Sequence, residues 1–93
     1  MKKIILNFPN EITRLFGKEF GKEIYTLQIK DEIDYSKKNI IVIPENIEDV
    51  SISFVQGLTE DVFISIRKDQ FQKYFLVKGN PKVVDKVVKS IYY

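Results

Sequence analysis

The sequence predicts a single small α/β domain whose sheet is mainly parallel or mixed, with crossover helices between the strands. Three observations carry this prediction. Residues 40–43 form a continuous apolar run, which is typical of a strand covered on both faces. Residues 52–68 carry a wide apolar stripe at helical spacing. Strand-like and helix-like patterns alternate along the 93 residues, and strands separated by helices need crossover connections.

The first strand is expected from Lys3 to Phe8, where β-branched and aromatic residues precede the breaker Pro9-Asn10. The stretch from Glu11 to Gly21 has a mixed pattern, and its two glycines weaken any long helix. The sequence therefore predicts a strand at the start of the chain and leaves the next segment open.

Residues 18–33 fit two patterns. Phe20, Ile24 and Leu27 fall at i, i+4 and i+7, which is one apolar stripe of a helix. The residues after Ile24 also alternate between apolar and polar side chains, which is a strand pattern. We favour a helix over residues 18–33 and keep a strand as the alternative.

A polar loop from Asp34 to Lys38 leads into the strand at residues 40–43. Pro44 ends this strand, because proline has no N–H to give to the ladder. The helix over residues 52–68 contains Gly57, and glycine inside a helix costs about 1 kcal/mol relative to alanine. We expect a close approach of this helix to the sheet to explain the glycine.

The third strand is expected from Gln72 to Lys78, where side chains alternate in character. The turn Gly79-Asn80-Pro81 follows, and Pro81 suits the first turn of a helix because its missing N–H is no loss there. The apolar stripe of this last helix consists of Val83, Val84, Val87, Val88 and Ile91. The predicted order is β, α, β, α, β, α over one domain spanning residues 1–93.

Composition excludes several functions. Hydrophobic residues at 44% and charged residues at 30% are typical of a globular protein. The chain has no Cys and no His, so disulfides, thiolate or imidazole metal sites and a Ser-His-Asp triad are excluded. A formal charge of +2 gives no strong attraction to nucleic acid or membrane surfaces. We expect a cytoplasmic protein with no catalytic residues, metal or cofactor, and no membrane span.

From Asn39 to Ile91 the chain resembles the STAS-like domain of unknown function, a small bacterial and phage relative of the sulfate-transporter and anti-sigma-factor-antagonist (STAS) domains. The resemblance is carried by a strand, an acidic loop, the run Val50-Ser51-Ile52-Ser53-Phe54 before a helix, and the later turn Gly79-Asn80-Pro81. It implies a STAS-like fold and a regulatory role in protein binding. STAS-like members often occur beside ATPases of the histidine-kinase type, so the resemblance implies such a partner.

In anti-sigma-factor antagonists, the corresponding helix starts with Asp-Ser-Ser-Gly, and a partner kinase phosphorylates the second serine. Ser53 matches that serine in this chain. Ser51, Ile52 and Phe54 stand where those proteins have the aspartate, the first serine and the glycine. The resemblance therefore marks Ser53 as a phosphoacceptor candidate with altered surroundings.

The residues themselves place two serines at the start of a helix. A serine at the N-cap accepts a backbone N–H bond worth about 1 kcal/mol, and this structural role is the one we expect first. A phosphate at the same place would gain from the helix dipole and the free N–H groups. Open α/β sheets bind ligands at the carboxyl ends of their strands, which is where this loop lies. The partner-binding candidates are Glu48, Asp49, Ser51, Ser53 and Gln56.

Two further clusters carry charge. The acidic loop with Glu45, Glu48 and Asp49 lacks the ligand number of a calcium loop, and we interpret it as a solvated loop. A basic stripe on the last helix could meet phosphates, although the nearly balanced charge argues against nucleic acid as the partner. The stripe consists of Lys78, Lys82, Lys86 and Lys89.

Two alternatives to the regulatory module remain open. The chain could be an inhibitor from a phage or mobile element that acts by binding alone, or a weak nucleic-acid-binding protein that uses the basic stripe. Tyr92 and Tyr93 are candidates for a homodimer or partner contact, and a frayed terminus is an equal alternative.

Overall fold

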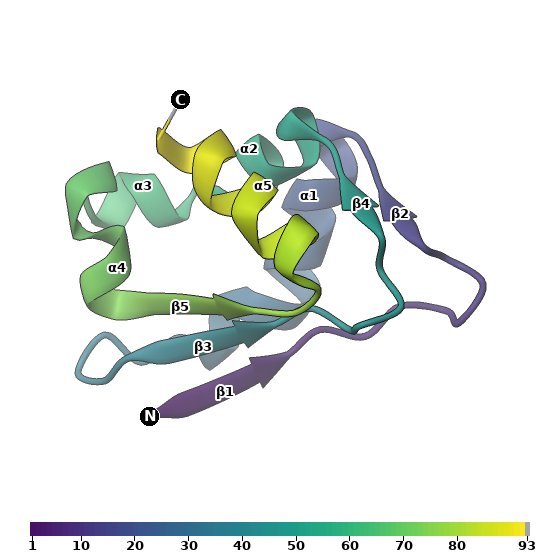
Figure 1. Cartoon of the computed structure of the whole chain (residues 1–93). Helices are drawn as coiled ribbons and strands as arrows, with labels where there is room; N and C mark the ends of the chain where they lie inside the picture. The colour runs from purple at the N-terminus through teal and green to yellow at the C-terminus, as the bar shows by residue number, and fades with distance from the viewer. Residues whose placement is uncertain (93) are drawn as a thin grey trace.

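The main sheet of the computed structural model, which describes residues 1–92, contains β1 (Lys2–Ile5), β3 (Asn39–Val42) and β5 (Phe75–Lys78). The strands lie in the order β1-β3-β5, and both neighbouring pairs are parallel. Helices occur in each connection between these strands, and in Figure 1 the labelled helices lie above the sheet. The predicted α/β class with a mainly parallel sheet is confirmed.

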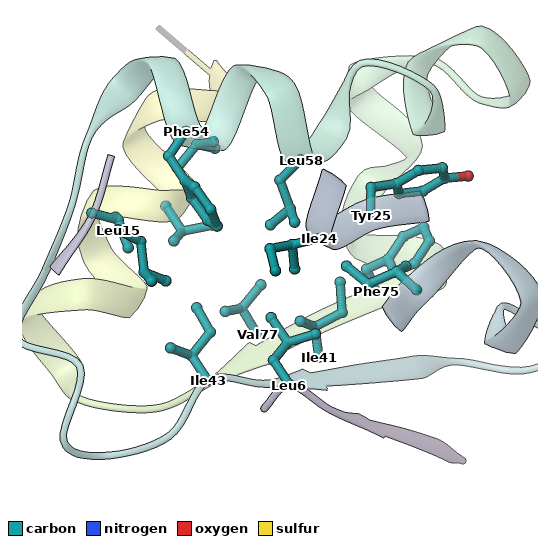
Figure 2. Packing of buried hydrophobic residues seen from close by; sticks show 14 of the residues in the cluster. Leu6, Leu15, Ile24, Tyr25, Ile41, Ile43, Phe54, Leu58, Phe75 and Val77 are labelled. Carbon is teal, nitrogen blue, oxygen red and sulfur yellow. The ribbon is translucent and has the colours of Figure 1, made fainter. Parts of the chain in front are cut away.

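One face of the main sheet builds the core. Ile4, Ile41 and Val77 share one row of the strand register and belong to the buried cluster. Figure 2 shows side chains from the sheet and from the helices filling the space between them, with Phe54 and Leu58 facing the sheet from above. Side chains alternate along a strand, so the neighbouring rows of the register point to the opposite face.

The first strand is shorter than the predicted range, which ran to Phe8. Regular pairing ends at Ile5, and the Leu6 N–H adds one bond to the Val42 carbonyl oxygen at 2.9 Å. The next residue, Asn7, is bound by the side chain of Gln28 instead of by a strand. Its N–H donates to the Gln28 Oε1 at 2.7 Å, and the Gln28 Nε2 donates to its carbonyl oxygen at 2.9 Å.

Residues 18–33 are helical over most of their length, so the favoured helix is confirmed and the strand alternative is wrong. The segment begins as α1 (Lys18–Ile24) and continues as a π-helical turn, η1 (Tyr25–Ile29). It ends in a 3-10 turn, η2 (Lys30–Glu32). Helical geometry wins because it buries Ile24, Tyr25 and Ile29 together.

Helix α2 (Ile52–Thr59) packs closely against α1. A Cβ atom on Gly57 would overlap the carbonyl oxygen of Lys18, and one on Gly21 would overlap the carbonyl oxygen of Phe54. Each glycine therefore lets the backbone of the other helix approach. The expectation that Gly57 approaches the sheet is wrong, because the neighbour is α1.

The prediction of one continuous helix over residues 52–68 is wrong. Helix α2 stops before Glu60, and α3 (Val62–Ser65) begins after a turn. The Glu60 carboxylate pairs with the ammonium groups of Lys18 at 3.3 Å and Lys22 at 3.1 Å. The turn thus ties the end of α2 to the surface of α1, a long-range contact that a local hydrophobic pattern does not reveal.

The third strand begins at Phe75, later than the predicted start at Gln72. Two short helical segments precede it, η3 (Lys68–Gln70) and α4 (Phe71–Tyr74). The rings of Phe71 and Phe75 stack with centroids 5.1 Å apart, and the ring of Phe63 lies 5.9 Å from that of Phe71. This aromatic packing stabilises the helical turn where alternation predicted a strand.

A second, small sheet was not predicted. Strands β2 (Arg14–Leu15) and β4 (Asp49–Val50) pair in parallel, beside α5 (Pro81–Tyr92). Leu15 and Val50 are fully buried, so the small sheet is anchored to the core. The loop after β3 therefore leads into a strand before it reaches α2, as Figure 1 shows.

Helix α5 begins at Pro81, as predicted, and buries Val83, Val87 and Ile91. Tyr92 is part of α5 and is exposed, whereas Tyr93 lies outside the described residues. Within residues 1–92, no helix has both the length and the apolar character needed to cross a membrane.

Candidate functional site

The junction between β4 and α2 is organised by the hydroxyl group of Ser51. Ser51 is the N-cap of α2, and its Oγ accepts the N–H of Phe54 at 3.0 Å. The same oxygen accepts the N–H of Gly17 at 3.3 Å. The backbone N–H of Ser51 donates to the Leu15 carbonyl oxygen at 2.9 Å. One serine thus joins the start of α2 to the end of β2.

Ser53 lies in the first turn of α2 and is half-buried. Its Oγ is 3.0 Å from the Oγ of Ser51, so the two hydroxyl groups share a hydrogen bond. Of the two predicted serines, Ser51 holds the capping role. The hydroxyl of Ser53 is held close to the positive end of the α2 dipole.

Asp49 connects the junction to α5. Its Oδ1 accepts a bond from the Lys86 ammonium at 3.0 Å and one from the Val50 N–H at 2.9 Å. The bond from Lys86 lowers the pKa of the Asp49 carboxyl, and the charge of Lys82 acts in the same direction. Of the predicted partner-binding residues, Asp49 is therefore already engaged within the fold.

Glu48 and Gln56 are exposed at the two ends of the predicted segment. Glu48 follows the turn that begins at Pro44, and its N–H donates to the Thr13 carbonyl oxygen at 2.6 Å. The five predicted site residues follow one another from the residue before β4 into α2, and Gln56 also lines a hollow with Glu60 and Ser90. Only the outer ones, Glu48 and Gln56, are classed as exposed.

Two exposed apolar side chains flank Ser51. Ile52, directly after it, is 56% exposed, and Phe16, next to Gly17, is 51% exposed. Phe16 was not among the predicted site residues, because it lies 35 positions before Ser51 and only the β2–β4 pairing brings it near. The sequence feature that marks this turn is Gly17. Its φ of 97° lies in the left-handed region that favours glycine, and it turns the chain from β2 into α1.

The other charged candidates are separated by the fold. In α5, Lys86 pairs with Asp49 and Lys89 pairs with Asp85, each at 3.0 Å. Lys78 lies on β5, outside the helix. The predicted basic stripe is thus not one continuous free surface. Within residues 1–92, no group of three or more acidic side chains is placed to hold a metal ion.

We define the candidate site by the exposed residues that adjoin Ser51 along the chain or through its bond to Gly17, which are Glu48, Ile52, Gln56 and Phe16. We call it the junction surface. Comparison with models of known protein families, with curated proteins and with solved structures finds no match to this chain.

Proposed function

We propose that this chain is a non-enzymatic regulatory module of the cytoplasm that binds a protein partner through the junction surface. The observation that carries the proposal is that Phe16 and Ile52 are exposed while their chain neighbours, Gly17 and Ser51, are joined by a hydrogen bond. Large apolar side chains that stay exposed beside polar groups are typical of protein-binding surfaces. Of the two, the aromatic one has the character of an interface anchor.

The backbone beneath these residues is tied at several points. The Ser51 hydroxyl bonds two backbone N–H groups from different segments, and the Asp49–Lys86 pair ties β4 to α5. Binding of a partner here costs little conformational entropy, because the backbone of this chain is already ordered. These contacts support recognition by a preformed surface rather than by a segment that folds on binding.

The resemblance to STAS-like domains implies an ATPase of the histidine-kinase type as the partner, and Ser53 as the phosphoacceptor. A phosphate on Ser53 would add about two negative charges near the positive end of α2. It would also stand next to Ile52 and change the apolar character of the surface. Phosphorylation would therefore weaken the binding of a partner that contacts Ile52.

One observation favours a second candidate, an inhibitor of phage or mobile-element origin that binds constitutively. The Ser53 hydroxyl is half-buried and hydrogen-bonded to Ser51. A serine with a purely structural role would have the same surroundings. Such an inhibitor would use the same surface and would tolerate Ser53→Ala.

The test is a capture experiment in the native host with tagged protein. We expect wild type and Ile64→Glu to retain the same partner and Ile52→Glu to lose it. Ile64 is the matched control because it is also an exposed isoleucine, but on α3. Equal capture by all three proteins would reject the junction surface.

Two serine variants separate the two candidates. If Ser53 is a switch, Ser53→Asp should release the partner, and mass spectrometry should find phosphate on the wild-type serine. Retention of the partner by Ser53→Asp and Ser53→Ala, with unmodified serine, would reject the switch and leave constitutive binding.

A further inference from the structure

The main sheet has a second face that the described helices do not cover. Parallel sheets in proteins are nearly always covered on both faces. Here the labelled helices lie above the sheet in Figure 1, and none of those labels lies below β1. This second face is a feature separate from the junction surface.

Two rows of the strand register point to this face. The first row contains Lys3, Ile40 and Leu76, and the second contains Ile5, Val42 and Lys78. We call these six residues the open face. None of its apolar members belongs to the core cluster or to the side chains packed against it. Ile5 is 59% exposed and Leu76 is 39% exposed, whereas Ile40 on the central strand is only 5% exposed.

The open face is apolar in the middle and basic at two opposite corners. Ile40 and Val42 occupy the central strand, while Lys3 and Lys78 lie on the two edge strands. All of its charged members are lysines. A second copy of this chain would bring lysines against this basic patch, so charge complementarity favours an acidic partner.

The size of the open face indicates what kind of element fits it. Three strands about 4.8 Å apart and four residues of about 3.3 Å each give an area of roughly 10 Å by 13 Å. That is much smaller than the roughly 800 Å² per partner of a standard interface between two globular proteins. It matches one helix, which is about 10–12 Å wide with its side chains and needs about nine residues to span 13 Å.

We propose that the open face binds a single acidic amphipathic helix supplied by another protein. The apolar stripe of that helix would cover Ile5, Val42 and Leu76, and its flanking carboxylates would pair with Lys3 and Lys78. The complex would complete the sheet as a three-layer α/β unit. This inference is independent of the proposed function, because the two surfaces share no residue.

The test uses two designed helical peptides of 14 residues with the same leucine stripe, one with glutamate and one with lysine at the flanking positions. Isotope-labelled protein is titrated with each peptide and followed by NMR. We expect the glutamate peptide to bind and to shift the signals of the open face. We expect the lysine peptide to bind at least about tenfold more weakly, because its charges oppose Lys3 and Lys78.

Two variants make the test specific. The double variant K3E/K78E should reverse the preference between the peptides, and because both lysines are exposed the fold should be retained. The matched control K30E/K68E changes two exposed lysines on η2 and η3 and should leave the preference unchanged. Ile5→Glu should abolish binding, whereas Ile64→Glu should not.

Any of four results would overturn the proposal. One is the absence of binding by the glutamate peptide to wild-type protein. Another is equal binding of both peptides, and a third is shifts confined to other surfaces. The last is a dimer in sedimentation that Ile5→Glu dissociates, since the open face would then be an interface between two copies of this chain.

Discussion

Ser51 shows how one side chain can hold two segments that are distant in sequence. Its hydroxyl accepts from Phe54 within α2 and from Gly17 at the end of the β2 segment. The capping role was predictable from the sequence, because a serine before an apolar helical run is a standard start signal. The bond to Gly17 was not predictable, since it depends on the pairing of β2 with β4.

The two serines should therefore differ in their effect on stability. Ser51→Ala removes the acceptor for two N–H groups and should lower the free energy of unfolding by about 1–2 kcal/mol. Ser53→Ala removes only the hydroxyl that bonds to Ser51 and should cost less than about 0.5 kcal/mol. Urea denaturation of the three proteins measures the difference. Equal losses for the two variants would show that Ser51 does not hold the junction.

The Asp49–Lys86 pair gives the protein a specific acid sensitivity. The bond from Lys86 lowers the pKa of Asp49 in the folded protein relative to the unfolded chain. The stability from this pair is complete above the unfolded pKa of about 3.9 and is lost as the pH falls through the lower folded-state pKa.

Asp49→Asn should therefore weaken the dependence of stability on pH below about pH 4. Asp31→Asn is the control, because Asp31 is an exposed aspartate on η2. Urea midpoints measured across the acid range provide the test. An unchanged acid dependence in Asp49→Asn would contradict the role of the pair.

At the scale of elements, local patterns predicted which segments are helical better than they predicted where helices end. The stripe of Phe20, Ile24 and Leu27 identified the helical segment at residues 18–33, although Leu27 is exposed in the structure. The break at Glu60 was missed because apolar residues continue past it at helical spacing, at Val62 and Ile66. The small sheet was missed because strands of two residues carry no readable alternation.

Two effects compete in Gly57→Ala at the contact between α1 and α2, and the sign of the change in stability decides between them. Helix propensity alone predicts that Gly57→Ala stabilises the protein by about 1 kcal/mol. The overlap of the new Cβ with the Lys18 carbonyl predicts the opposite, a loss of about 2–3 kcal/mol. Thermal or urea unfolding measures the sign. Stabilisation by Gly57→Ala would show that the two helices do not approach as closely as described.

At the scale of the whole molecule, the parallel α/β class followed from the alternation of strand and helix patterns, and the structure confirms it. One expectation about the strands differs from the structure. Residues 40–43 read as a strand covered on both faces, yet the residues on one of its faces lie outside the core cluster. The apolar character of Ile40 was visible in the sequence, but the absence of a covering helix among residues 1–92 was not.

The buried side chains form one core cluster to which the main sheet, the small sheet and the helices α1, α2 and α5 all contribute. The protein should therefore unfold in a single cooperative transition. Circular dichroism in the far ultraviolet and tyrosine fluorescence should give the same urea midpoint. Separate midpoints would show that the packing around the tyrosines of residues 1–92, which lie on η1, α4, α5 and the loop after η2, is lost independently of the helices and strands.

The central claim is that a partner protein binds at the junction surface, and hydrogen exchange of this chain with and without its captured partner tests it most directly. We expect partner-dependent protection in residues 14–17 and 48–56, because both segments contribute to that surface. Protection that spares both segments and appears elsewhere, for example only along the strands of the main sheet, would contradict the claim.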